Sequence, residues 1–141
     1  MTNKILFNKP FIGKYEKLFI NQVIDNKKFT DGEFQNKAKN VISKMIKSKC
    51  LELTHSCSSA LEISMLLINL KKGDEVIMPS YTFTSTANAV LLRGGKPVFV
   101  DVSANDVNLN YKLVERKINK KTKAIIVVHY AGIACDMNNF L

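Results

Sequence analysis

Hydroxyl and aromatic side chains gather just after two strand-like stretches of this 141-residue chain. Residues 75–78 are strand-like, and residues 79–90 then give a proline, hydroxyls around Tyr81 and Phe83, and an apolar helical pattern. A similar crossing lies upstream, where residues 51–54 lead into the serine-rich residues 55–59. Because ligands of open α/β sheets bind at the carboxyl ends of strands, the two crossings predict one ligand site on a parallel sheet.

The serine-rich stretch could bind an anion. Cys57, Ser58 and Ser59 would form the first turn of a helix, whose unpaired N–H groups and positive dipole end favour a phosphate. The Ser58 hydroxyl would add a hydrogen bond. The alternative is a helix cap alone, because residues 59–62 match a capping box with Ser59 as the N-cap and Glu62 reaching back.

The aromatic residues and a histidine also allow two interpretations each. Phe83 could stack on a flat cofactor ring, although a core position is the commoner fate of a phenylalanine. Tyr81 and the hydroxyls around it could contact a substrate or only form a turn and a cap. His129, which precedes Tyr130, could be a base or donor beside a ligand, or a histidine hydrogen-bonded in the core.

Charge and composition narrow the class of protein. Apolar residues make up 46% and charged residues 23%, as in a globular protein, and the net charge is +9. Most of this charge lies in residues 1–50, which hold 11 lysines against 4 acidic residues. The whole chain has 19 lysines but only 2 arginines. Scattered lysines without arginine forks argue against a nucleic-acid partner.

The cysteines and the apolar runs of the sequence indicate the cellular compartment in which we expect the protein. The three cysteines are odd in number and lack C-x-x-C spacing, which argues against a disulfide framework or a metal site and favours the cytoplasm. The longest aliphatic run, residues 124–128, is far too short to cross a membrane, so we expect no membrane partner.

The pattern along the chain predicts an α/β fold. We expect an amino-terminal helical segment over residues 1–49 and an α/β domain over residues 50–141. The latter alternates strands and helices, which favours a mostly parallel sheet with helices on both faces. The strands are expected at 50–54, 75–79, 97–102 and 123–129, and the helices at about 59–70, 84–93, 111–118 and from near Asp136. Since a helix is only beginning where the sequence stops, we expect the domain to be incomplete.

Two phosphate-binding fingerprints do not occur in the sequence. Neither G-x-G-x-x-G nor G-x-x-x-x-G-K-[ST] is found, so dinucleotide and nucleoside-triphosphate sites are not indicated. A phosphate at a serine-rich helix start, with an aromatic ring after the next strand, suits pyridoxal phosphate better.

Several motifs together resemble the DegT/DnrJ/StrS group of sugar aminotransferases, which are pyridoxal-phosphate enzymes of fold type I. The resemblance lies in residues 73–83 and 85–89, continues through 98–102 and 127–132, and includes the Asp31–Gly32 pair before the first long helix. It implies the amino-terminal part of a fold-type-I large domain and pyridoxal 5'-phosphate as cofactor.

The resemblance also implies a reaction. The family member would transfer an amino group from glutamate to a dTDP-linked 4-keto-6-deoxyhexose, as a homodimer, for synthesis of a surface polysaccharide such as O-antigen or common antigen. The alternatives are another nucleotide-sugar aminotransferase of the group, or a non-catalytic α/β binding fragment.

Site residues follow from the same resemblance. Ser58 stands where the family uses a threonine or serine on the cofactor phosphate, with Cys57 and Ser59 beside it. Phe83 stands where an aromatic residue stacks on the pyridine ring.

Substrate contacts are implied elsewhere. Asp31 and Gly32 match a loop that approaches the sugar, and Tyr81, His129 and Tyr130 match motifs near the substrate without an assigned role. The aspartate for the ring nitrogen and the Schiff-base lysine are expected beyond residue 141. The sequence therefore offers no catalytic residue, and we expect the 141-residue chain alone to be inactive.

Overall fold

The computed structural model describes residues 5–6, 8–30 and 32–141. The chain divides into two compact units, Met1–Leu53 and Thr54–Leu141, and each is described by itself.

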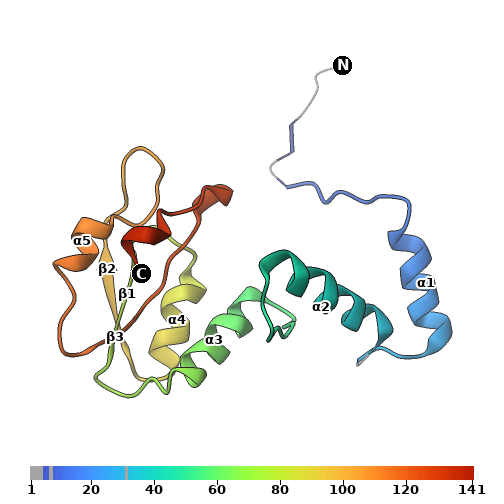
Figure 1. Ribbon diagram of the computed structural model, residues 1–141, viewed down its shortest axis with the longest axis horizontal. Coiled ribbons are helices and arrows are strands. Elements are labelled where there is room, and N and C mark those ends of the chain that lie inside the picture. Colours follow the sequence, from blue (N-terminus) through green and yellow to red (C-terminus); the bar gives the residue numbers. More distant parts are fainter. Residues whose placement is uncertain (1–4, 7, 31) are drawn as a thin grey trace. The chain divides into compact units, whose positions relative to one another are not determined.

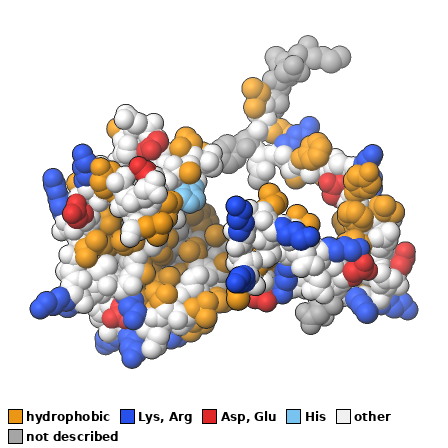
Figure 2. Space-filling model, viewed as in Figure 1, with side chains coloured by type: hydrophobic (Ala, Val, Ile, Leu, Met, Phe, Trp, Pro, Cys, Tyr) orange, Lys and Arg blue, Asp and Glu red, His pale blue; other side chains and the backbone are white. Residues whose placement is uncertain are grey.

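The first unit contains two helices, α1 (Glu16–Asn26) and α2 (Glu33–Ile46), in the two stretches where the apolar spacing is helical. The Phe19 and Phe34 rings meet with their centroids 5.2 Å apart. None of the described residues in either helix is buried. Figure 2 shows apolar side chains between the lysines on the visible face of these helices.

The second unit is built on a parallel sheet of three strands, β1 (Glu75–Pro79), β2 (Lys96–Val100) and β3 (Thr122–Ile125). The order in the sheet is β2-β1-β3. Helix α3 (Cys57–Leu67) precedes β1, α4 (Thr84–Leu92) connects β1 to β2, and α5 (Tyr111–Glu115) lies between β2 and β3. All five residues of the central strand β1 are buried.

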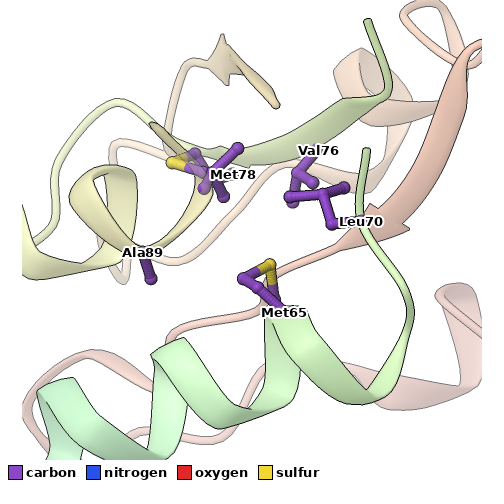
Figure 3. Close-up of a cluster of buried hydrophobic side chains, with 6 residues drawn as sticks. Met65, Leu70, Val76, Met78 and Ala89 are labelled. Carbon is purple, nitrogen blue, oxygen red and sulfur yellow. The ribbon is translucent and has the colours of Figure 1, made fainter. Parts of the chain in front are cut away.

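Helices cover both faces of the sheet (Figure 1). Because β2 and β3 lie on opposite sides of β1, right-handed crossovers place α4 and α5 on opposite faces. Side chains of α3, α4, β1 and the segment between α3 and β1 form one apolar cluster, shown in Figure 3: Met65, Leu70, Val76, Met78, Ala89 and Val90. The other face holds Ile77, Val100, Leu109 and Val114. The predicted parallel sheet with helices on both faces is confirmed.

Several predicted elements differ in the structure: the strand predicted at 97–102 ends at Val100, and the helix predicted at 111–118 ends at Glu115. Residues 50–54 are not a strand, because no described strand pairs with them. The last element is only a short 3₁₀ turn, Met137–Asn139. The strand predicted at 123–129 ends at Ile125. The Ile126 N–H still bonds the Ile77 carbonyl at 2.8 Å, but the next ladder bond would need an N–H at Pro79, which proline lacks.

Among the described residues, no helix has both the length and the apolar character needed to span a membrane.

Candidate functional site

Helix α3 begins three residues earlier than the capping-box prediction required. Its N-cap is Ser56, whose backbone is extended and whose Oγ accepts the Ser59 N–H at 3.1 Å. Ser59 is therefore the third residue of the helix, and the prediction of Ser59 as N-cap with Glu62 reaching back is wrong. The physical reason is that Ser56 has the same capping hydroxyl and lies where the chain leaves its extended conformation.

This start leaves two backbone N–H groups at the amino-terminal end of α3 without a hydrogen bond to any described residue. Ser59 N–H is bonded to Ser56 Oγ, and Ala60 N–H bonds the Ser56 carbonyl at 3.2 Å. The N–H groups of Cys57 and Ser58 hydrogen-bond to no described residue. The first turn contains no acidic side chain, so the positive end of the helix dipole is not neutralised locally. Cys57 is exposed and Ser58 half-buried. The arrangement fits an anion.

A histidine that the sequence analysis did not select joins this helix start. His55 Nε2 lies 2.9 Å from Ser59 Oγ, which is 3.0 Å from Ser56 Oγ. The Ser59 hydroxyl is thus engaged within the protein. The only sign of this contact in the sequence was that His55 stands four residues before Ser59, just ahead of the helix.

Phe83 lies on the surface and not in the core. It is the N-cap residue of α4, just beyond the carboxyl end of β1, and its side chain is 76% exposed. It lines a cavity of about 220 Å³ together with Ser80, Thr82, Thr84, Ala87, Asn88 and Phe99. Ser58 is not among the residues that line this cavity. The exposed ring offers a face for stacking.

Two tyrosines far apart in the sequence meet at this edge of the sheet. Tyr81 follows β1 and Tyr130 follows β3, and their ring centroids lie 5.1 Å apart. The Tyr130 hydroxyl donates to the Tyr81 hydroxyl at 3.2 Å. This hydrogen bond and the electrostatic effect of Tyr81 raise the pKa of Tyr130, so its phenol stays protonated. The pair is a neutral hydrogen-bonding surface.

His129 is exposed and bonded to the backbone. Its Nδ1 accepts the Cys135 N–H at 3.0 Å. Because Nδ1 accepts this bond, the neutral ring carries its proton on Nε2 and presents a donor there. The alternative of a histidine enclosed in the core therefore does not apply to this residue.

Asn108 is a further residue of this region that sequence reasoning missed. Its side chain is buried, with 3% exposed, and it bonds the backbone at both Tyr130 and Ile133. An asparagine among polar residues predicts only a turn, so nothing in the sequence marked it.

Of the two residues expected to approach a sugar, Gly32 lies in the first unit. It is the N-cap residue of α2 and makes no side-chain cap. It lines a cavity of about 430 Å³ with residues that include Phe29, Thr30 and Glu33. Asp31 lies outside the described residues.

A parallel α/β sheet, a helix start with backbone N–H groups that bond no described residue, and exposed aromatic rings are typical of a class of cofactor-binding folds. Within that class, the sequence model of the DegT/DnrJ/EryC1/StrS aminotransferase family matches residues 10–141. The chain belongs to this family.

Solved structures share the fold. Spr1654 of Streptococcus pneumoniae, named as a sugar aminotransferase and solved in its PMP form, is 30% identical with a TM-score of 0.90, over 96% of this chain and 34% of that one. The GDP-4-keto-6-deoxy-D-mannose-3-dehydratase of E. coli, with bound hydrated PLP, is 26% identical with a TM-score of 0.87, over 94% and 36%. The fold is therefore that of the amino-terminal part of fold-type-I aminotransferases, as expected.

A relative is similar to this chain in sequence. The uncharacterised protein MJ1066 of Methanocaldococcus jannaschii is 40% identical over 136 residues, which are 94% of this chain and 34% of that protein. The chain thus spans about a third of the length of the relatives it matches.

Proposed function

We propose that this chain forms part of the pyridoxal-phosphate site of a nucleotide-sugar aminotransferase. The observation that carries the proposal is the start of α3, where the N–H groups of Cys57 and Ser58 bond no described residue and no acidic side chain lies in the first turn. Family membership and the PLP and PMP forms of the solved neighbours support it.

In this proposal the chain's residues hold and orient the cofactor. The N–H groups of Cys57 and Ser58 and the Ser58 hydroxyl bind the phosphate, with Ser59 fixing the helix start through Ser56 and His55. Phe83 gives a stacking face for the ring. When bound, pyridoxal phosphate supplies the electron sink for moving an amino group.

We further propose a substrate and setting. The activity is that of a dTDP-4-amino-4,6-dideoxygalactose transaminase, with glutamate as amino donor, acting in the synthesis of a surface polysaccharide. The motifs at residues 73–89 and 127–132 support it. Tyr81, His129 and Tyr130 would contact the substrate from the sheet edge, and Asp31 and Gly32 from their loop. The enzyme would be a cytoplasmic homodimer; its three cysteines are free thiols, as suits a reducing compartment.

A second reaction is favoured by one observation. The E. coli dehydratase shares the fold at 26% identity, so the same family fold accompanies a sugar dehydratase. The two reactions give different products, an amino sugar and a deoxy sugar, and product analysis separates them.

The cofactor site can be tested on the 141-residue chain by measuring the Kd of pyridoxal phosphate and of pyridoxal, which lacks the phosphate. Ser58→Ala should weaken pyridoxal-phosphate binding roughly tenfold or more, the effect of losing one hydrogen bond to a charged group, and leave pyridoxal binding unchanged. Ser64→Ala is the matched control, because Ser64 lies on the same helix and its hydroxyl bonds only the Ala60 carbonyl. Equal Kd values for the two variants would reject the phosphate site.

The reaction is assayed with a full-length enzyme that contains this chain. This enzyme should aminate a dTDP-linked 4-keto-6-deoxyhexose with glutamate in preference to UDP-linked or GDP-linked keto sugars. Failure with every keto sugar would remove the aminotransferase assignment. The 141-residue chain, assayed alongside, tests the expectation that it is inactive alone.

A further inference from the structure

The turn that carries Tyr130 has an unusual backbone. Ala131 and Gly132 are both left-handed, with φ of 52° and 83°. The turn is closed by Gly132 N–H on the His129 carbonyl at 3.2 Å and by Ile133 N–H on the Tyr130 carbonyl at 3.0 Å. A non-glycine residue in this region is disfavoured, so an outside contact is needed to hold the conformation.

The Asn108 side chain supplies that contact at both ends of the turn. Its Oδ1 accepts the Tyr130 N–H at 3.1 Å, and its Nδ2 donates to the Ile133 carbonyl at 3.1 Å. The amide has an acceptor and a donor on one planar group, and both are used here. The side chain is buried, so water does not compete for these bonds.

Asn108 is itself fixed by its neighbours. Its backbone N–H donates to Asp106 Oδ1 at 3.1 Å, and its Nδ2 also lies 3.4 Å from Asp106 Oδ2. The first of these bonds is the main cause that lowers the pKa of Asp106 and keeps it ionised. The Asn108 backbone carbonyl accepts the Ser103 N–H at 2.8 Å. These bonds to Asp106 and Ser103 fix the position of Asn108 independently of the turn.

We propose that Asn108 is a positioning residue: its side-chain amide fixes the turn after His129 and thereby places the Tyr130 hydroxyl on Tyr81 at the substrate side of the sheet. The part that concerns substrate rests on the function proposed above. Asn108 lies in the connection from β2 to β3, whereas Tyr81 follows β1. It acts through the backbone of Tyr130, without touching the substrate.

The test compares Asn108→Asp with Asn110→Asp in the 141-residue chain. An aspartate at 108 can accept from Tyr130 but cannot donate to Ile133, and it sets a carboxylate against that carbonyl and Asp106. At 110 the same change is harmless, because Asn110 only accepts, from Lys112 N–H at 3.1 Å, and aspartate caps a helix equally well.

The readout is the titration of the tyrosine rings, followed by NMR, with Tyr130→Phe to assign the signal of Tyr130. In Asn108→Asp the pKa of Tyr130 should fall toward that of an isolated phenol, since the hydroxyl no longer reaches Tyr81; in Asn110→Asp it should stay raised. A Tyr130 titration unchanged in folded Asn108→Asp would overturn the proposal.

A second measurement covers the case that Asn108→Asp does not fold. In the unaltered chain, the Tyr130 amide should exchange with solvent at least about tenfold more slowly than that of the exposed Ala131, because Asn108 Oδ1 protects it. Exchange of the Tyr130 amide at the same rate as that of Ala131 would overturn the proposal that Asn108 fixes this turn.

The substrate part is tested separately in a full-length enzyme that contains this chain. Asn108→Asp should raise the KM for the keto sugar about five- to tenfold, the effect of one misplaced hydrogen bond, and leave the Kd of pyridoxal phosphate unchanged. An unchanged KM with a shifted Tyr130 titration would reject the substrate role alone. Absence of any pyridoxal-phosphate binding would reject the proposed function and leave the titration result standing.

Discussion

The two units of this protein bury their apolar side chains to very different degrees. In the second unit Val76, Ile77 and Met78 of β1 are 0% exposed. In the first unit Ile20 and Met45 are 58% and 76% exposed, although both lie in helices. An apolar groove of about 760 Å³ lies between α1 and α2.

The difference shows what a central strand adds to a pair of helices. Helices on both faces of a sheet enclose β1, whereas a helix packed on one other helix covers only one stripe of its surface. The candidate cofactor and substrate residues of the second unit therefore stand on a packed framework. Matched substitutions in the two units test whether the second unit is packed more tightly than the first.

The largest expected effect is the loss of a core side chain from β1. Ile77→Ala should reduce the free energy of unfolding by about 2–5 kcal/mol, because it removes buried methyl groups and leaves a cavity. Ile20→Ala in α1 should cost less than about 1 kcal/mol, since its side chain is already mostly in water. Urea unfolding of each variant measures both. Equal costs would show that the first unit also has a closed core.

The second prediction concerns backbone close to packed side chains. A Cβ on Gly95 would lie 2.7 Å from Leu70 Cδ2 and 3.0 Å from Val90 Cγ1, so Gly95→Ala should cost about 1–3 kcal/mol by overpacking. At Gly32 the nearest atom would be the Lys28 carbonyl at 3.5 Å, an ordinary contact. Gly32→Ala should cost below about 1 kcal/mol, the loss of a permissive N-cap residue. Thermal unfolding distinguishes them, and the reverse order would contradict the packing described.

The third prediction is a dependence of stability on pH. Glu75 Oε2 accepts from Asn119 Nδ2 at 2.8 Å, and Oε1 accepts from Lys96 Nζ at 3.3 Å. These bonds, that of Asn119 first, lower the pKa of Glu75. A lowered pKa means that the stabilisation is present above the unfolded value, about 4.3, and is lost as pH falls through the folded one.

Asn119→Ala should therefore destabilise the chain most at neutral pH, and the difference from the unaltered chain should shrink as pH falls below about 4. Urea unfolding over this pH range measures it. In a Glu75→Gln background the same substitution should give a difference that no longer varies with pH. A pH-dependent difference that survives Glu75→Gln would assign the effect to another group.

The smallest effect is expected for an ion pair on the surface of the first unit. Lys37 bonds Glu33 one turn away on α2, and this lowers the pKa of Glu33. Both side chains are more than half exposed. Glu33→Gln should change stability only slightly at low salt and not at all in about 1 M salt, where screening acts within about 3 Å. A change as large as that of Asn119→Ala, persisting in high salt, would mean that the pair is sheltered.

The elements were predictable where local pattern and tertiary pairing agree. Residues 75–79 and 84–92 form the strand and helix that alternation and apolar spacing indicate. Residues 51–54 have an equally strand-like pattern but no described neighbour to pair with, and a strand without a ladder is not formed. The α3 start was misplaced by three residues because Ser56 and Ser59 are chemically equivalent caps, and only the backbone conformation selects Ser56.

The sequence by itself determined the family, the parallel order of strands and helices, and the identity of the hydroxyl and aromatic groups at the strand ends, since these depend on residue type and near spacing. Tertiary structure alone decided which groups meet. It joined Tyr81 to Tyr130 and set Asn108 against the turn after His129. Such contacts depend on the directions in which separate strands end, and a local pattern of residues carries no information about those directions.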